Sequence, residues 1–287
     1  MNRNDIKQIG SLAGIHFRQW SGNWRIRILF LLVVLLLFNF TKSVRSLTSF
    51  SGIPVSPWIL IPCMSTYNTA ILILLGYVLL YCDAPFIDEK YPYIMIRSGR
   101  WHFAAAQMLY IALSSALYIV FVWLVSLLCC LPNLSFSLRW GKVIQTIALR
   151  EEVSGLTMRD TLLQMQPIHA ALLQFLLLWL VGCWIGLLLF CLNLYFSRAV
   201  GIGVATALIF ANMFADFYIA SHTQAGGTIY YFLPTSWANL GTLHAVEGDR
   251  YPPLLYALLV LLASSAVFIF LIFIKFRHEE VEVVPSI

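Results

Sequence analysis

Long apolar runs are the feature that most constrains this chain. A bilayer core is about 30 Å thick, and an α-helix needs about 20 mainly apolar residues to cross it. Helices satisfy their own backbone hydrogen bonds, which lipid cannot do for them. The runs cover residues 24–46, 58–82, 103–131, 169–197, 199–219 and 254–274. We therefore expect an all-α polytopic membrane protein with six transmembrane helices in a single transmembrane domain, residues 1–287.

Composition supports this interpretation. The chain is 60% hydrophobic and 15% aromatic, and its mean hydropathy is +0.83. Soluble domains are about half apolar, so one water-soluble core is excluded. The net charge of +5 is modest. It fits an inner membrane surface, and since we find no basic patch with interleaved aromatic residues, we expect no nucleic-acid partner.

The distribution of Lys and Arg predicts the topology. Six spans would place both termini on the same side, and cations concentrate on the cytoplasmic side of membrane proteins. If the termini are cytoplasmic, the inner segments hold eleven of the 18 Lys and Arg: Arg3, Lys7, Arg18, Arg25, Arg27, Lys90, Arg97, Arg100, Arg198, Lys275 and Arg277. We therefore expect both termini in the cytoplasm. For the chain as a whole we expect a multi-pass protein of the plasma membrane, of bacterial origin.

An amphipathic stretch, residues 1–23, precedes the first span. Apolar residues recur there at steps of three and four, on one helical face: Ile6, Ile9, Ala13, Phe17, Trp20 and Trp24. Such a helix would lie in the inner interface and contact membrane lipid. The alternative is a frayed tail that only looks periodic.

Two polar segments are expected outside the membrane. Residues 132–168 form the longest polar segment, with room for one or two short helices, and we expect an extracellular loop. Residues 220–253 hold an aromatic centre, 229–240, too short to span the membrane. We expect an extracellular hairpin there, re-entrant or lying in the interface, with its bend at Pro234.

The loop at residues 83–102 concentrates charge. It contains Asp83, Asp88, Glu89, Lys90, Arg97 and Arg100. Each charge would cost about 2.5–3.5 kcal/mol at the bilayer centre, so these residues must face water or protein. One interpretation is a magnesium pyrophosphate site, like the Asp-rich motifs of membrane prenyltransferases. The spacing does not match, and the sequence contains no second Asp-rich motif.

Other catalytic patterns do not fit. A phosphate-binding loop needs glycines before Lys and then Ser or Thr, whereas Gly141-Lys142 is followed by Val143. The six histidines are scattered singly, and the six cysteines lie in or beside apolar runs, as small hydrophobic residues do. The Glu151-Glu152 pair lacks the arginine of an intramembrane protease motif. We expect no catalytic residue, metal or cofactor in this chain.

The layout resembles the permeases of type-2 ABC exporters. Those proteins share an amphipathic N-terminal helix, six spans, a charged loop after the second span and an aromatic hairpin before the last. Two local stretches are similar: "DEKYPYIMIRSGRWHFAAAQ" from Asp88, and the Pro-Thr-Ser-Trp turn at Pro234 to Trp237. One difference is the outer connection at 132–168, which is usually short in that class.

The resemblance implies a role for the charged loop. In that family, the loop is a cytoplasmic coupling loop that docks on separate ATPase subunits, and these bind the ATP and Mg²⁺. It also implies a second permease subunit, identical or related. The corresponding residues here are Asp88, Glu89, Lys90, Tyr91, Tyr93, Arg97 and Arg100.

The resemblance also implies a translocation path between permease subunits. Uncharged aromatic linings such as Phe30 and Phe38 would suit an amphipathic or apolar cargo: a peptide, a drug or a lipid-like molecule. Asp216 is the one clear charge within a span, and the alternative is an interfacial carboxylate that reaches water. The candidate path or gate residues are Tyr67, Phe210, Asn212, Phe214, Asp216, Pro234 and Trp237.

Two other functions stay open at this point. The chain could be a membrane enzyme that acts on lipid or polyprenyl phosphate through Asp83, Asp88 and Glu89. It could also be a non-transporting immunity or sensor subunit that sequesters a peptide through residues 139–166.

Overall fold

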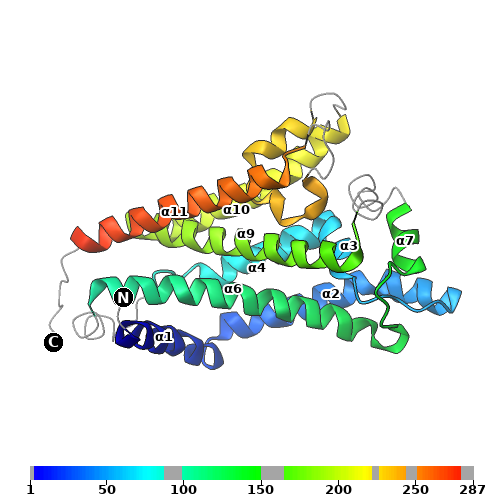
Figure 1. Cartoon of the computed structure of the whole chain (residues 1–287), viewed down its shortest axis with the longest axis horizontal. Coiled ribbons are helices and arrows are strands. Elements are labelled where there is room, and N and C mark those ends of the chain that lie inside the picture. The colour runs from blue at the N-terminus through cyan, green and yellow to red at the C-terminus, as the bar shows by residue number, and fades with distance from the viewer. Residues whose placement is uncertain (1–2, 87–98, 150–164, 222–225, 244–250, 279–287) are drawn as a thin grey trace.

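The computed structural model describes residues 3–86, 99–149, 165–221, 226–243 and 251–278. Within these ranges the regular elements are helices arranged in an elongated bundle (Figure 1), which confirms the predicted all-α class. In chain order they are α1 (Arg3–Arg18), η1 (Gln19–Ser21), α2 (Trp24–Ser51), α3 (Leu60–Ser65), α4 (Tyr67–Tyr81), α6 (Arg100–Cys130), η2 (Leu131–Asn133), α7 (Lys142–Leu149), α9 (Pro167–Tyr195), α10 (Arg198–Ser221), η3 (Gly226–Phe232), η4 (Ser236–Ala238), η5 (Leu240–Thr242) and α11 (Leu254–His278).

In the described part of the chain, five helices are long and apolar enough to cross a membrane. They are α2, α6, α9, residues 198–215 of α10 and residues 254–277 of α11. The run at 58–82 differs from the other predicted spans because it is divided into α3 and α4. The break falls at Thr66, whose backbone is extended with ψ of 114°. The apolar helix α4 has 15 residues, fewer than a bilayer crossing usually needs.

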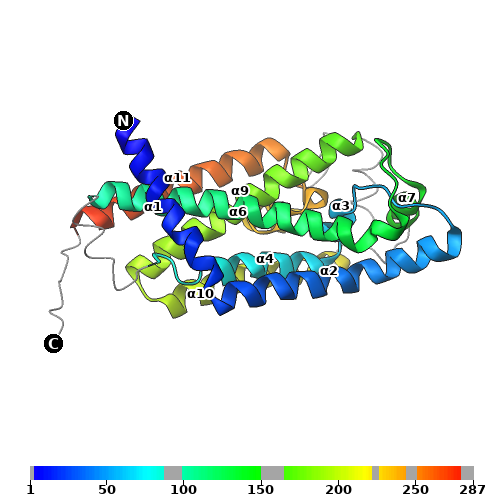
Figure 2. The ribbon, with the colours of Figure 1, turned by 90° about the horizontal axis from the view of Figure 1, so that it is seen from below.

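The long helices run back and forth along the bundle axis. Figures 1 and 2 show the end of α4, the start of α6 and the end of α11 at one end of the molecule, which we call the loop end. α7 lies at the opposite end, which we call the α7 end. The apolar window of α9 is 67% buried and that of α11 only 17%. α9 is therefore the central helix, and α11 exposes apolar side chains.

The core is closely packed where α4 meets α6 and α9. Tyr77 and Tyr118 are fully buried, and each hydroxyl donates to a backbone carbonyl, Leu178 O at 3.2 Å and Ile73 O at 3.1 Å. A Cβ on Gly182 would overlap the Tyr77 ring and the Ser115 hydroxyl. Small residues allow membrane helices to approach closely in this way.

The N-terminal segment forms the predicted helix, and part of its apolar face packs on α6. Ile9 and Ala13 are buried, and Trp20 donates a hydrogen bond to the Tyr110 hydroxyl at 2.8 Å. Ile6 and Trp24 are 56% and 72% exposed. The face predicted for lipid contact is therefore divided between the α6 interface and an exposed remainder.

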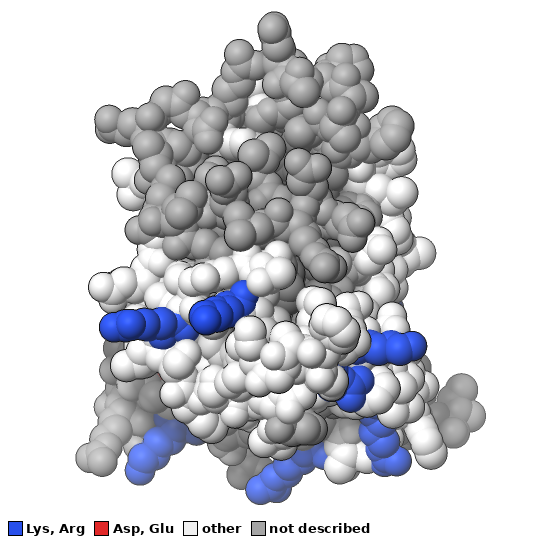
Figure 3. Space-filling model, turned by 90° about the vertical axis from the view of Figure 1, so that its right-hand side faces the viewer, with Lys and Arg blue, Asp and Glu red and all other residues white. Residues whose placement is uncertain are grey.

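Short connections cover the α7 end. Val55 forms an isolated parallel bridge with Leu134, and Trp58 Nε1 donates to Ser137 O at 3.0 Å. In the predicted loop 132–168 the described regular elements are the end of η2, α7 and the first two residues of α9, which begins at Pro167. In Figure 3 the charged side chains visible at this end are Lys and Arg among the described residues.

The predicted hairpin at 220–253 contains three short 3₁₀ helices in its described part, η3, η4 and η5. η4 and η5 pack on α9, and η3 packs on α10. Trp237 is fully buried, and its Nε1 donates to Tyr230 O at 2.8 Å. Some aromatic residues of this segment, such as Trp237, are therefore part of the protein core.

Candidate functional site

The turn after α4, residues 82–86, lies where several helices meet at the loop end. We call it the Asp83 turn. It directly precedes residues 87–98, which lie outside the described part of the chain. Helix α4 ends at Tyr81. Side chains and carbonyls of the turn that follows it contact α2, α6, α9 and α10.

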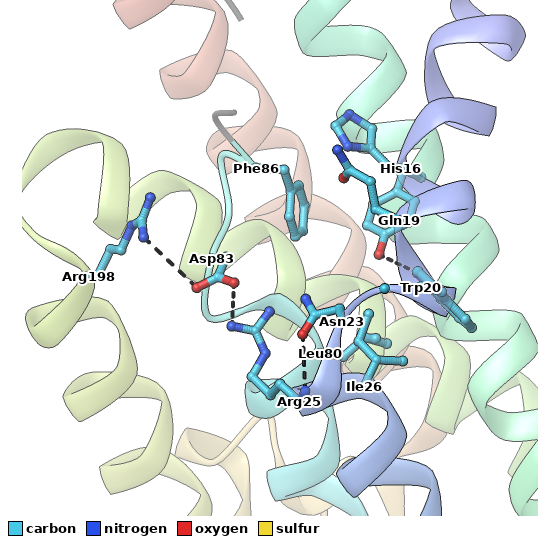
Figure 4. Close-up of a pocket in the computed structure, with 12 residues that line it drawn as sticks. His16, Gln19, Trp20, Asn23, Arg25, Ile26, Leu80, Asp83, Phe86 and Arg198 are labelled. Carbon is cyan, nitrogen blue, oxygen red and sulfur yellow. Dashed lines mark hydrogen bonds and ion pairs between the residues drawn. The ribbon is translucent and has the colours of Figure 1, made fainter. Parts of the chain in front are cut away.

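Asp83 forms ion pairs with two helices. Its carboxylate contacts Arg25 at the start of α2, and its other oxygen lies 3.9 Å from Nη1 of Arg198, the first residue of α10. The side chains of Arg25, Asp83 and Arg198 are 27%, 41% and 58% exposed. Figure 4 shows the carboxylate between the two guanidinium groups. Asp83 therefore links α2 with α10 through the turn.

The carbonyls of the Asp83 turn are bound by amide side chains from two further helices. Asn193 of α9 donates through Nδ2 to Cys82 O at 3.2 Å and to Ala84 O at 2.7 Å. Gln107 of α6 is fully buried and donates to Pro85 O. These bonds satisfy carbonyl oxygens of the turn that would otherwise lack partners, and they fix the turn to α6 and α9.

Gly201 of α10 makes room for Asn193, because a Cβ at this position would overlap Asn193 Oδ1. Gly201→Ala is expected to be less stable than Gly203→Ala by about 1–2 kcal/mol, since displacing Asn193 would break its two hydrogen bonds. Gly203 is the matched control because no heavy atom lies within 4 Å of its added Cβ. Thermal unfolding of both variants in detergent measures the difference, and equal stability would contradict this role of Gly201.

Aromatic rings form one wall of the site. The Phe86 ring lies 5.0 Å from that of Tyr110 and 5.6 Å from that of His16, measured between centroids. Phe86 has φ of +51°, in the left-handed region that a bulky residue rarely adopts. The packing of its ring on α1 and α6 holds this conformation.

A pocket of about 410 Å³ opens between the Asp83 turn and the junction of α1 with α2. We call it the Asp83 pocket, and Figure 4 shows its lining. The lining residues are His16, Gln19, Trp20, Gly22, Asn23, Arg25, Ile26, Leu80, Asp83, Phe86, Tyr110 and Arg198. Asn23 caps α2, and its side chain accepts a hydrogen bond from Arg25 N at 3.0 Å. The pocket thus combines two cations and one carboxylate with aromatic side chains.

The other end of the charged loop is attached to different helices. Arg100 begins α6, and its Nη1 donates to Arg277 O of α11 at 3.4 Å. The Trp101 ring stacks on that of Phe273 at 4.6 Å between centroids. His102 Nε2 lies 3.6 Å from Asp5 Oδ1 of α1. The loop is therefore attached to α2, α6, α9 and α10 at its start, and to α1 and α11 at its end.

The residues predicted for ATPase coupling are described only at the edges of this loop. Arg100 contacts α11, as above. Asp88, Glu89, Lys90, Tyr91, Tyr93 and Arg97 lie outside the described residues, as does any contact that they make.

The candidate path residues whose side chains the structure describes divide between the core and the surface. Asn212 is buried and lies 3.2 Å, Oδ1 to Oγ1, from Thr235, the neighbour of Pro234. Phe210 and Phe214 are exposed on the surface, and Trp237 is buried in the core. Tyr67 begins α4. The side chains of Tyr67 and Asp216 are outside the described part of the structure.

Phe30 and Phe38, the other aromatic residues expected to line the path, also differ in position. Phe38 is 52% exposed, and the Arg45 guanidinium lies 4.1 Å from its ring centroid. Phe30 packs at 4.5 Å from Phe121, centroid to centroid. Phe30 is thus part of the packing between α2 and α6.

Sequence reasoning did not assign site roles to Arg25, Arg198, Asn193 and Gln107. The two arginines contribute only to the predicted orientation of the chain, because both are distant from the charged loop in sequence. The two amides are polar residues inside apolar helices. Buried polar side chains are usually hydrogen-bonded, so the two amides predict buried hydrogen bonds.

No family model, curated protein or solved structure that was compared matches this chain.

Proposed function

We propose that this chain is the transmembrane permease subunit of an ATP-driven exporter of the ABC type. It would move an amphipathic or apolar cargo across the plasma membrane. In this proposal α3 and α4 together complete a sixth span, and both termini lie in the cytoplasm. The loop end of the bundle would then be cytoplasmic.

The observation that supports the proposal is the attachment of the loop between α4 and α6. Its start is held by Arg25 of α2 and Arg198 of α10, and its end by Asp5 of α1 and Arg277 of α11. A force applied to this loop would act on these four helices at once, and on α6 and α9 through Gln107 and Asn193. A coupling element needs this property, because a separate ATPase must move the whole bundle through one small contact surface.

The same arrangement suggests what each subunit of the complex would do. The partner ATPase subunits would bind ATP and Mg²⁺, and their closure would draw the charged loops of two permease subunits together. The helices attached to each loop would then move as rigid bodies, as in hinge and shear transitions. The second permease subunit would be identical or related, and the cargo path would lie between the two.

The same ion pairs bear on the membrane-enzyme alternative. That function needs the Asp83 carboxylate as a ligand for Mg²⁺, and here both of its oxygens face arginines. Arg25 and Arg198 would compete with a metal ion for the same oxygens. This arrangement favours the permease over an enzyme that uses Asp83 as a metal ligand.

The direct test is co-purification of the full chain with P-loop ATPase subunits from the same organism. We expect a stable complex whose ATP hydrolysis depends on the permease. Glu89→Ala and Arg97→Ala should each weaken ATPase binding by about tenfold or more, as the loss of a central interface residue does. Lys142→Ala, at the α7 end, is the control and should leave binding unchanged. A chain that is active and monomeric without an ATPase would refute the proposal.

A further inference from the structure

The Asp83 pocket has more positive than negative charge. Two guanidinium groups and one carboxylate line it, a formal excess of one positive charge before His16 is considered. Such an excess in a partly enclosed space favours an anion, because water screens charges less effectively there. Gln19 and Asn23 are neutral polar residues of the same lining.

Asp83 does not use all the donors of the two arginines. Arg25 Nε is buried, and no hydrogen-bond partner for it is found among the described residues. Arg198 reaches the carboxylate only at 3.9 Å, whereas charge-assisted hydrogen bonds are about 2.7–2.9 Å long. Since a guanidinium has five N–H donors, both side chains can bind a further group with several oxygens.

The position of the pocket suits a ligand at the membrane surface. Arg25 and Arg198 stand in the first turns of α2 and α10, where the helix dipoles favour an anion. Trp20 and Tyr110 line the same space, and Trp and Tyr are typical of the headgroup level of membrane proteins. A volume of about 410 Å³ is within the range of small-molecule sites.

We propose that the Asp83 pocket binds the phosphoryl group of an anionic ligand through Arg25 and Arg198, in competition with Asp83. At the headgroup level, an anionic phospholipid supplies this chemistry, and a water-soluble phosphate compound shares it. The proposal rests on the membrane character of the chain and not on the permease function, so either can fail alone.

The experiment measures binding of short-chain phosphatidylglycerol to the purified full chain in neutral detergent, with phosphatidylcholine as the uncharged comparison. Arg25→Gln and Arg198→Gln should each weaken phosphatidylglycerol binding by about tenfold or more, because each removes a charge-assisted contact. Asp83→Asn should strengthen it, because it removes the competing carboxylate. If Arg25, Arg198 and Asp83 only stabilised the fold, their substitutions would not change phosphatidylglycerol binding in opposite directions.

Arg27→Gln is the matched control. Arg27 lies on the same helix near the same depth, but it is exposed, does not line the pocket and stacks over Trp24 at 4.8 Å from the ring centroid. Its substitution should change binding by less than about twofold, below the effect of one hydrogen bond. An equal loss in Arg27→Gln and Arg198→Gln, or weaker binding in Asp83→Asn, would overturn the proposal.

Inorganic phosphate separates the two possible sources. If it displaces the lipid and binds with similar affinity, the pocket is assigned to a soluble phosphate compound. If it does not displace the lipid, the pocket is assigned to a phospholipid headgroup. Arg198 is the more exposed of the two arginines, so Arg198→Gln retains the test if Arg25→Gln does not fold. If the chain binds phosphate as expected but forms no complex with an ATPase, only the permease proposal is refuted.

Discussion

Gly182→Ala is expected to destabilise the helical bundle by about 1–3 kcal/mol, the usual cost of overpacking a core. The added Cβ would overlap Tyr77 and Ser115, which come from α4 and α6. Neither can withdraw easily, because Tyr77 is fully buried and bonded to Leu178 O. The change should appear as a lower unfolding temperature of the purified protein in detergent.

Gly14→Ala is the control for this prediction. Gly14 lies within helix α1, and no heavy atom would lie within 4 Å of its new Cβ. Alanine is the better helix former by about 0.5–1 kcal/mol, so this variant should be as stable as the original protein or slightly more so. If the two variants unfold at the same temperature, the close approach of α9 to α4 and α6 does not limit stability.

Asp83→Lys is the second change with a large expected effect. It removes two ion pairs and places a third cation beside Arg25 and Arg198. Like charges about 4 Å apart repel by about 1–4 kcal/mol between water and a protein surface. All three side chains are partly exposed, so we expect a cost of about 1–2 kcal/mol after screening. Unfolding in detergent at low salt measures this cost, and added salt should reduce it.

A charge exchange tests the cause. Adding Arg198→Asp to Asp83→Lys restores an opposite-charge pair and should recover part of the lost stability. Arg27→Asp removes the same charge from an exposed position outside the pocket, and it should recover less. Equal recovery by the two would mean that net charge at this end of the bundle, rather than the Asp83 ion pairs, determines the stability.

The helices were largely predictable because hydrophobic length is a strong signal. The predicted run at 169–197 corresponds to α9, Pro167–Tyr195, and its first residue, Pro167, is a common helix start. The break between α3 and α4 was not predictable in the same way. It falls at Thr66, in a stretch without Gly or Pro at the break itself, and hydropathy alone does not distinguish one helix from two.

The site was predictable only in part. The sequence singles out the charged loop, because charge between two apolar runs is unusual. The partners of Asp83 are distant in sequence, since Arg25 begins α2 and Arg198 begins α10. Pairing them requires knowing which helices are neighbours, and no sequence periodicity contains that information. Asn193 and Gln107 show the same difficulty, because a polar residue predicts a partner without identifying it.

The division of the second apolar run has a mechanical consequence. α4 has 15 residues, so it is a rod about 22 Å long at 1.5 Å per residue. At one end it is joined to the separate helix α3, which is fully buried and packs on α7 and η5. Its other end continues into the Asp83 turn. The extended backbone of Thr66 therefore separates two rigid elements, and a displacement of the Asp83 turn would be carried along α4 as far as this break.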